Sequence, residues 1–279
     1  MPRVSITLPS LRPNFLSQCL AAIYESAEYD DYEVLVVSPF EVRADKVRWI
    51  EEKQKNGNCR AHALAYEHAS GDIIVAMTDY IIPRRKWLKN AVEHVSFYER
   101  KIFPYCSGLF WSNSSAIGPT IGTIFGRYYP YYPIATRKSL EAIGGWYSCE
   151  FVANYGDADI GLRIWAAGGA CQVCWDSVIA ASYARSMVPS HQIGLKAQEQ
   201  ISCDQMVFVK KWQKIYGEGW STERRASFNC DLPLAYLHFD DMGLTPLIVR
   251  PNDVAGGNVQ ILLDELPPER RYDGVEILK

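Results

Sequence analysis

Short apolar segments alternate with amphipathic helical patterns through the N-terminal third of the chain, and this alternation restricts the fold more than any other feature. The predicted strands cover residues 4–8, 32–37, 47–50 and 73–77, and the predicted helices cover residues 14–24, 58–69 and 87–98. Residues 32–37 are almost continuously apolar, as expected of a parallel strand that helices cover on both faces. The alternation therefore predicts a parallel, doubly wound sheet with helices on both sides.

Such a sheet predicts where a ligand binds, because ligands of open α/β folds lie beyond the carboxyl ends of the strands. Pro9 and Ser10 follow the first predicted strand, Ser38 follows the second and Asp79 follows the fourth. We expect these residues to lie at one edge of the sheet and to form a site there.

The composition is that of a globular protein with enough length for a large core, since 48% of its 279 residues are hydrophobic and 22% are charged. The formal net charge of -3 argues against a nucleic-acid partner. Residues 1–9 lack the apolar centre of a signal peptide, and the most apolar long stretch, residues 103–125, is broken by polar residues, Gly and Pro. We therefore expect a cytoplasmic protein without a transmembrane helix.

The cysteines indicate core thiols rather than a metal site. Cys171 and Cys174 have the local spacing of a zinc ligand pair, but no second pair completes a set of four among the eight cysteines and the histidines. We expect both thiols in the core, on the same face of a strand or nearly so, in a reducing compartment.

Two further regions divide the chain. Residues 105–137 are rich in Gly, Ser, Pro and aromatic residues, which suit either the face of a sugar or a buried hairpin. A helix is predicted at 195–216, and residues 217–279 are rich in Pro, Gly and charge. We expect a main domain at 1–216 and a C-terminal extended arm at 217–279. A homo-oligomer formed through the arm and a peripheral membrane contact of the aromatic segment both remain open.

Residues 144–163 carry the strongest functional signal. The Gly144-Gly145 pair allows positive φ and a close approach of the backbone to a ligand. Asp157 and Asp159 then open a predicted helix at 157–167, where the helix N-terminus favours a carboxylate. A carboxylate held beside a pocket suits a general base. The alternative is a helix cap at Asp157, and Asp159 is expected to support the helix start or to pair with Arg163.

Four segments in this order resemble the GT-A fold of family 2 glycosyltransferases, over roughly residues 3–215. The segments are residues 4–13, 57–74, 78–83 and 144–163. The resemblance implies a GT-A-like doubly wound mixed, mostly parallel sheet flanked by helices, with a C-terminal extension. It also implies an inverting glycosyltransferase that moves a sugar from a nucleoside-diphosphate donor to a hydroxyl of a carbohydrate or glycolipid acceptor.

The resemblance implies a divalent cation, Mg²⁺ or Mn²⁺, because the leaving diphosphate gathers negative charge. Asp79 matches one metal-binding acid, while Tyr80 stands where a second acid is usual. We therefore expect a weakly held ion, bound mainly by Asp79 and the donor phosphates. His191 is a candidate for a further metal or phosphate contact, and Arg185 and Lys196 are alternative cations for the diphosphate.

The acceptor side follows from the segment at 144–163. The resemblance implies that Asp157 is the catalytic base, with Glu150 as the second candidate. Gly156 stands where the family usually has Glu, so we expect the pKa of Asp157 to be less raised than it would be beside a like charge. Trp146 and Tyr155 are expected to bind the acceptor, with Trp146 as a floor under a sugar ring.

The nucleotide pocket departs further from the family pattern. The residues that the resemblance places around the donor are Pro9, Ser10, Glu41, Asn58, Arg60 and Asp79. Ser38 stands where the family usually carries an Asp that meets uracil, so UDP is only the default donor nucleotide. These departures leave open a catalytically degenerate protein that binds a nucleotide or a carbohydrate on the same fold. A nucleotidyltransferase and a dinucleotide oxidoreductase are disfavoured, because no Gly-rich loop follows the first strand.

Overall fold

The computed structural model of the chain describes residues 2–113, 123–124, 127–181, 190–216, 236–239, 246–249 and 276–278. Its centre is an eight-stranded sheet. In spatial order the strands are β4 (Val47–Glu51), β2 (Tyr32–Ser38), β1 (Val4–Pro9), β5 (Ile73–Ala76), β10 (Pro133–Thr136), β7 (Tyr105–Asn113), β11 (Ala170–Ala181) and β6 (Ile81–Pro83). The helices are α1 (Pro13–Ser26), α2 (Asn58–His68), α3 (Trp87–Glu99), α4 (Arg137–Ala142), α5 (Gly156–Ala166) and α7 (Ser190–Tyr216).

The sheet is mixed and mostly parallel, as the sequence predicts. Strands β4, β2, β1 and β5 run parallel to one another, and so do β7 and β11. Strand β10 is antiparallel to both of its neighbours, and β6 is antiparallel to β11. The four strands and three helices predicted in the N-terminal part are all present, and their ends shift by at most two residues.

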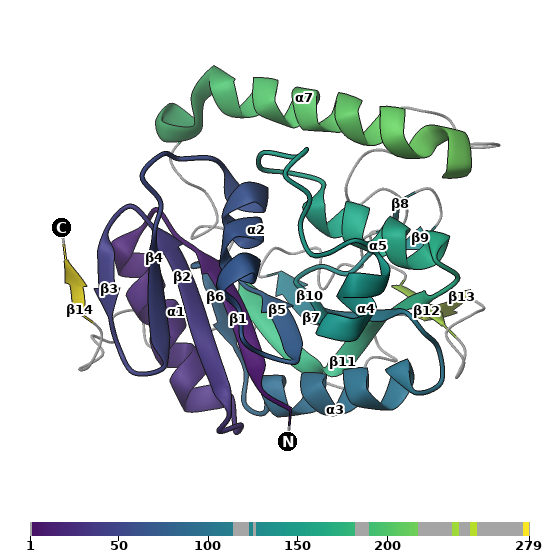
Figure 1. Cartoon of the computed structure of the whole chain (residues 1–279), viewed down its shortest axis with the longest axis horizontal. Coiled ribbons are helices and arrows are strands. Elements are labelled where there is room, and N and C mark those ends of the chain that lie inside the picture. Colours follow the sequence, from purple (N-terminus) through teal and green to yellow (C-terminus); the bar gives the residue numbers. More distant parts are fainter. Residues whose placement is uncertain are drawn as a thin grey trace.

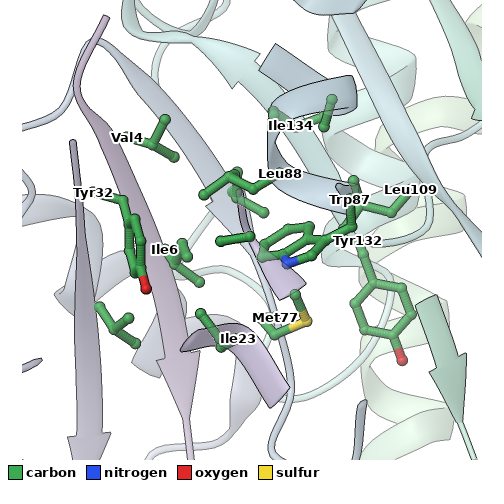
Figure 2. Packing of buried hydrophobic residues seen from close by; sticks show 14 of the residues in the cluster. Val4, Ile6, Ile23, Tyr32, Met77, Trp87, Leu88, Leu109, Tyr132 and Ile134 are labelled. Atoms are coloured by element: carbon green, nitrogen blue, oxygen red, sulfur yellow. The ribbon is translucent and has the colours of Figure 1, made fainter. Parts of the chain in front are cut away.

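The helices cover the sheet in two layers (Figure 1). Alternate residues of β1 explain this arrangement, because Val4 and Ile6 pack on one face against α1 and α3, whereas Thr7 bonds to His62 of α2 on the other. Figure 2 shows the first face, where the fully buried ring of Trp87 lies among Ile6, Met77 and Leu88. Residues of α2, α4, α5 and α7 pack on the opposite face.

The cysteines on β11 are buried, as expected, but the expectation that they face the same way is wrong. Cys171 Sγ contacts the carbonyl of Gly161 on α5, whereas Cys174 Sγ contacts the carbonyl of Asn90 on α3. Side chains an odd number of positions apart on a strand point to opposite faces. Among the described residues no group of three or more His, Cys, Asp or Glu side chains could hold a metal ion.

The described pieces of the C-terminal region are three short strands. Strand β14 (Glu276–Leu278) pairs antiparallel with β3 (Glu41–Arg43), at one side of the molecule in Figure 1. Strands β12 (Tyr236–Phe239) and β13 (Pro246–Val249) pair with each other, as do β8 (Thr123–Ile124) and β9 (Arg127–Tyr128). The division into a domain at 1–216 and an arm at 217–279 stays a prediction. None of the described helices has the length and apolar character of a membrane span.

Candidate active site

Two cavities lie at the carboxyl ends of β1 and β5. The larger, here called the strand-end cavity, has a volume of about 650 Å³ and is lined in part by Pro9, Ser10, Arg12, Lys55 and Asp79. The smaller, here called the tyrosine pocket, has a volume of about 220 Å³ and is lined in part by His62, Tyr131, Tyr132, Tyr147, Tyr155 and Asp157. Asn58, Thr78 and Tyr80 line both, so the two cavities are neighbours.

Parallel pairing of β1 with β5 brings the loops that follow them together. Ser10 Oγ donates a hydrogen bond to Asp79 Oδ2 at 2.8 Å, and Arg12 Nε donates to the same oxygen at 3.1 Å. A second nitrogen of the Arg12 guanidinium contacts Asp79 Oδ1. Asp79 is only 3% exposed, and a buried carboxylate requires such partners because desolvation of an unpaired charge is costly.

This pairing decides how well the residues present fit a divalent cation. Asp79 is engaged by Arg12 through both oxygens, and Tyr80 supplies no carboxylate. An ion at this carboxylate would lie beside the positive guanidinium and would repel it. The described residues therefore do not fit a protein-held divalent ion. His191 and Lys196 belong to the first turns of α7, but their side chains and all of Arg185 lie outside the described part of the chain.

The wall between the cavities depends on a close backbone contact at the start of α2. Gly57 has a φ of 97°, and a Cβ there would lie 2.4 Å from the carbonyl oxygen of Val152. The N–H of Cys59 donates to the same oxygen at 3.0 Å. Asp204 of α7 fixes the loop from behind, because its carboxylate accepts the N–H groups of residues 152–154 at 2.9–3.1 Å. Only a glycine at position 57 allows this approach.

Asp157 lies in the tyrosine pocket, in the first turn of α5. Its carboxylate accepts hydrogen bonds from the Tyr147 hydroxyl and from the backbone of Tyr132. Burial raises the pKa of Asp157 from 3.8 to about 6 and outweighs the lowering effect of these two bonds. The absence of Glu at position 156 therefore does not leave the pKa low, because desolvation alone disfavours the charged form.

The ring of Tyr147 explains why position 156 is a glycine. A Cβ at Gly156 would lie 2.3 Å from that ring, so any larger residue would displace it. The ring stacks on His62, with centroids 4.5 Å apart and planes inclined by 15°. Burial lowers the pKa of His62 to about 3, so the imidazole stays neutral at physiological pH, with its Nδ1 atom 2.8 Å from Thr7 Oγ1. Tyr147 is thus held between His62 and Asp157.

Of the predicted site residues whose side chains the structure describes, four line neither cavity. Trp146 is 3% exposed, and its Nε1 atom donates to Thr7 Oγ1 at 3.4 Å, so it belongs to the core rather than to a sugar floor. Glu150 is exposed and pairs with Lys211 at 2.8 Å, which holds its pKa below the usual value. The Arg60 side chain donates to the carbonyl of residue 149, and Glu41 pairs with the arginine two residues later.

The structure brings together Pro9, Ser10, Asn58 and Asp79 in the strand-end cavity, and Tyr155 and Asp157 in the tyrosine pocket. Sequence reasoning missed Arg12, Glu52, His62 and Tyr147, which also line these cavities, whereas Tyr132 belongs to the aromatic segment assigned either to a sugar face or to a buried hairpin. Arg12 was visible in the loop after the first strand, and His62 stands one helical turn after Asn58, so that both reach the same cavity.

Asp159 is structural, and its predicted pairing with Arg163 is confirmed. The carboxylate is fully buried, and Arg163 Nε donates to it at 2.8 Å, one helical turn away. Trp212 Nε1 donates to the other oxygen at 2.9 Å, and Lys211 lies 3.1 Å from it. These contacts join α5 to α7 and leave Asp157 as the acid of the pair that faces the pocket.

Solved structures share this fold at low sequence identity. GalNAc-T7 with UDP, GalNAc and Mn²⁺ matches with a TM-score of 0.53 and 12% identity over 65% of this chain and 44% of its own. The mannosyltransferase PcManGT from Pyrobaculum calidifontis, with GDP-Man and Mn²⁺, matches with a TM-score of 0.54 and 18% identity, over 79% of this chain and 66% of its own. S. aureus TarS 1–349 with UDP matches with a TM-score of 0.51 and 11% identity, over 74% of this chain and 65% of its own.

These three matches show a GT-A-like fold, shared with glycosyltransferases. The chain spans less than two thirds of the length of each of the three. No protein-family model matches the sequence, and no curated protein does.

Proposed function

We propose that the protein is an inverting glycosyltransferase of the family 2 type, which transfers a sugar from a nucleoside-diphosphate donor to a hydroxyl group of a carbohydrate or glycolipid. One observation carries the proposal. A carboxylate with a raised pKa lies in the tyrosine pocket, and a cavity with an arginine and a lysine lies next to it, across a wall formed in part by Asn58 and Tyr80. Asp157 on one side and Arg12 and Lys55 on the other thus lie around the position where the sugar would pass from the donor to the acceptor.

The tyrosine pocket suits the acceptor. Several tyrosines supply flat apolar faces together with hydroxyl groups, which is the combination that a sugar ring requires. Asp157 at its wall can accept a proton from an acceptor hydroxyl. Because its pKa is about 6, the carboxylate is ionised at neutral pH and is still a stronger base than an ordinary aspartate.

The strand-end cavity suits the donor. Ser10 and Asn58 line it, Lys55 supplies positive charge for a diphosphate, and the guanidinium of Arg12 lies there in its pair with Asp79. In the proposed step the acceptor oxygen forms a bond to the anomeric carbon, and its proton passes to Asp157. The bond from that carbon to the diphosphate oxygen breaks, and its electron pair leaves with the nucleoside diphosphate. Attack from the side opposite the leaving group inverts the anomeric configuration.

The test is release of nucleoside diphosphate from a panel of UDP-, GDP- and dTDP-sugars, with saccharide and glycolipid acceptors. We expect one donor to be consumed only in the presence of an acceptor, with inversion at the anomeric carbon as read by NMR. Retention of configuration would contradict the assigned role of Asp157.

A second candidate is a binding protein without transfer activity, favoured by the replacement of the second acid by Tyr80 and by the pairing of Asp79 with Arg12. Saturable binding of a nucleotide or a saccharide without turnover of any donor would favour this candidate.

A further inference from the structure

We propose that the guanidinium of Arg12 takes the place of a divalent cation in this site, so that the donor diphosphate binds without a metal ion. The inference rests on the proposed function, because it concerns how that donor is held. Asp79 is the acid that the family resemblance assigns to a metal. That acid already has a cationic partner on the neighbouring loop.

The contacts at Asp79 leave no charge for an ion to neutralise. Its two oxygens accept hydrogen bonds from Nε and a second nitrogen of Arg12 and from the hydroxyl of Ser10. A fork of two parallel N–H bonds is the strongest arrangement between an arginine and a carboxylate. A metal ion would have to displace a guanidinium that is itself only 22% exposed, and it would leave that charge without its partner.

The residue that replaces the second acid supports the cation instead. The guanidinium carbon lies 5.3 Å from the ring centroid of Tyr80 and 4.7 Å from that of Phe15. Aromatic rings at this distance attract a guanidinium through their negative faces. The Tyr80 hydroxyl in turn accepts a hydrogen bond from Tyr132 at 3.0 Å, which fixes the ring. Tyr80, which stands where a second acid is usual, thus helps to hold the guanidinium of Arg12 in place.

The rest of the cavity adds positive potential for a diphosphate. Lys55 lines it, and α2 begins beside it at Asn58, so the positive end of that helix dipole lies at the cavity. Among the described residues, the acids that line the same cavity are Glu52 and Asp79. Asp79 is paired with Arg12, and the carboxylate of Glu52, whose pKa burial raises, accepts the N–H of Asn56.

The test is calorimetric titration of the full chain with UDP and with GDP, once in EDTA and once with Mn²⁺. We expect the dissociation constant for the better nucleotide to be the same in both buffers. Arg12→Gln should weaken binding in EDTA by about 10- to 100-fold, the usual scale for hydrogen bonds to a charged group. Arg85→Gln is the matched control, because Arg85 also pairs with a carboxylate, that of Glu28, but lines neither cavity.

The outcomes separate the inference from the proposed function. A nucleotide that binds only with Mn²⁺ overturns the inference and leaves the transferase proposal standing. Equal binding to the parent and to folded Arg12→Gln overturns it as well. If neither nucleotide binds in either buffer, the donor assignment falls and the inference falls with it. Circular dichroism and the melting temperature establish that the variant is folded, and Arg12→Lys, which keeps the charge but loses the fork, should bind with intermediate affinity.

Discussion

Replacing Asp157 with asparagine should have opposite effects on activity and on stability. Asp157→Asn keeps the shape of the side chain and an oxygen that can accept from Tyr147, but it removes the basic site. Sugar transfer should fall by about 10²-fold or more, the scale for losing a general base. Nucleotide binding should survive, because Arg12 and Asp79 lie in the other cavity.

The stability change follows from the raised pKa. The native state binds the proton of Asp157 more tightly than the unfolded chain does, since the pKa is about 6 rather than 3.8. The free energy of unfolding of the parent should therefore fall as the pH rises from about 4 to 6. At 1.36 kcal/mol per pH unit the full difference is about 3 kcal/mol, and partial solvent contact reduces it to about 1–3 kcal/mol. The free energy of unfolding of Asp157→Asn should not fall in this way, because the asparagine side chain does not titrate.

Urea unfolding at pH 7.5 and at pH 4 measures the effect. We expect Asp157→Asn to be more stable than the parent by about 1–3 kcal/mol at pH 7.5 and equal to it near pH 4. A variant that is less stable at both pH values would mean that Asp157 serves as a helix cap. A variant that transfers sugar at the parent rate would refute the assignment of the base.

Three further changes test the surroundings of Asp157. Tyr147→Phe removes a hydrogen bond that lowers the pKa of Asp157, so the acid limb of kcat/KM against pH should move above about 6; an unmoved limb would show that the hydroxyl does not reach the base. Gly156→Ala should destabilise the fold by about 1–3 kcal/mol, because its Cβ would overlap Tyr147 and come 2.9 Å from Cys59 Sγ; an unchanged melting temperature contradicts this packing. Asp204→Ala should cost at least about 2 kcal/mol in urea unfolding, because three N–H groups lose their acceptor; a smaller loss would mean that water replaces it.

The sequence predicts the sheet well because its information is local. The near-continuous apolar run at 32–37 and the helical periodicity at 14–24 each lie within one element, and both elements are found. The sequence marks strands β10 and β11 less clearly, because β10 follows an aromatic segment without a clear period and β11 runs to twelve residues with a register shift after Cys174.

The site was predicted in outline and not in detail. Ser10 and Asp79 were expected together because they follow parallel strands, and they do meet. The role of Arg12 could not be predicted, since it depends on the direction of one side chain across the loop. The sequence analysis assigns Trp146 to the pocket and assigns no role to Tyr147. The turn after Gly145 buries the first and directs the second toward Asp157.

The three hydrogen bonds that Asp204 accepts have a thermodynamic consequence. Through these bonds, the docking of α7 on the domain is coupled to the ordering of residues 152–154, which form part of the wall between the two cavities. A ligand that orders residues 152–154 must also favour the docked helix, and by linkage the docked helix must favour the ligand to the same extent. The amide protons of residues 204–216 should therefore exchange more slowly when a nucleotide is bound. Occupancy of the cavity would then be measurable at residues 204–216, none of which is among the described residues that line it.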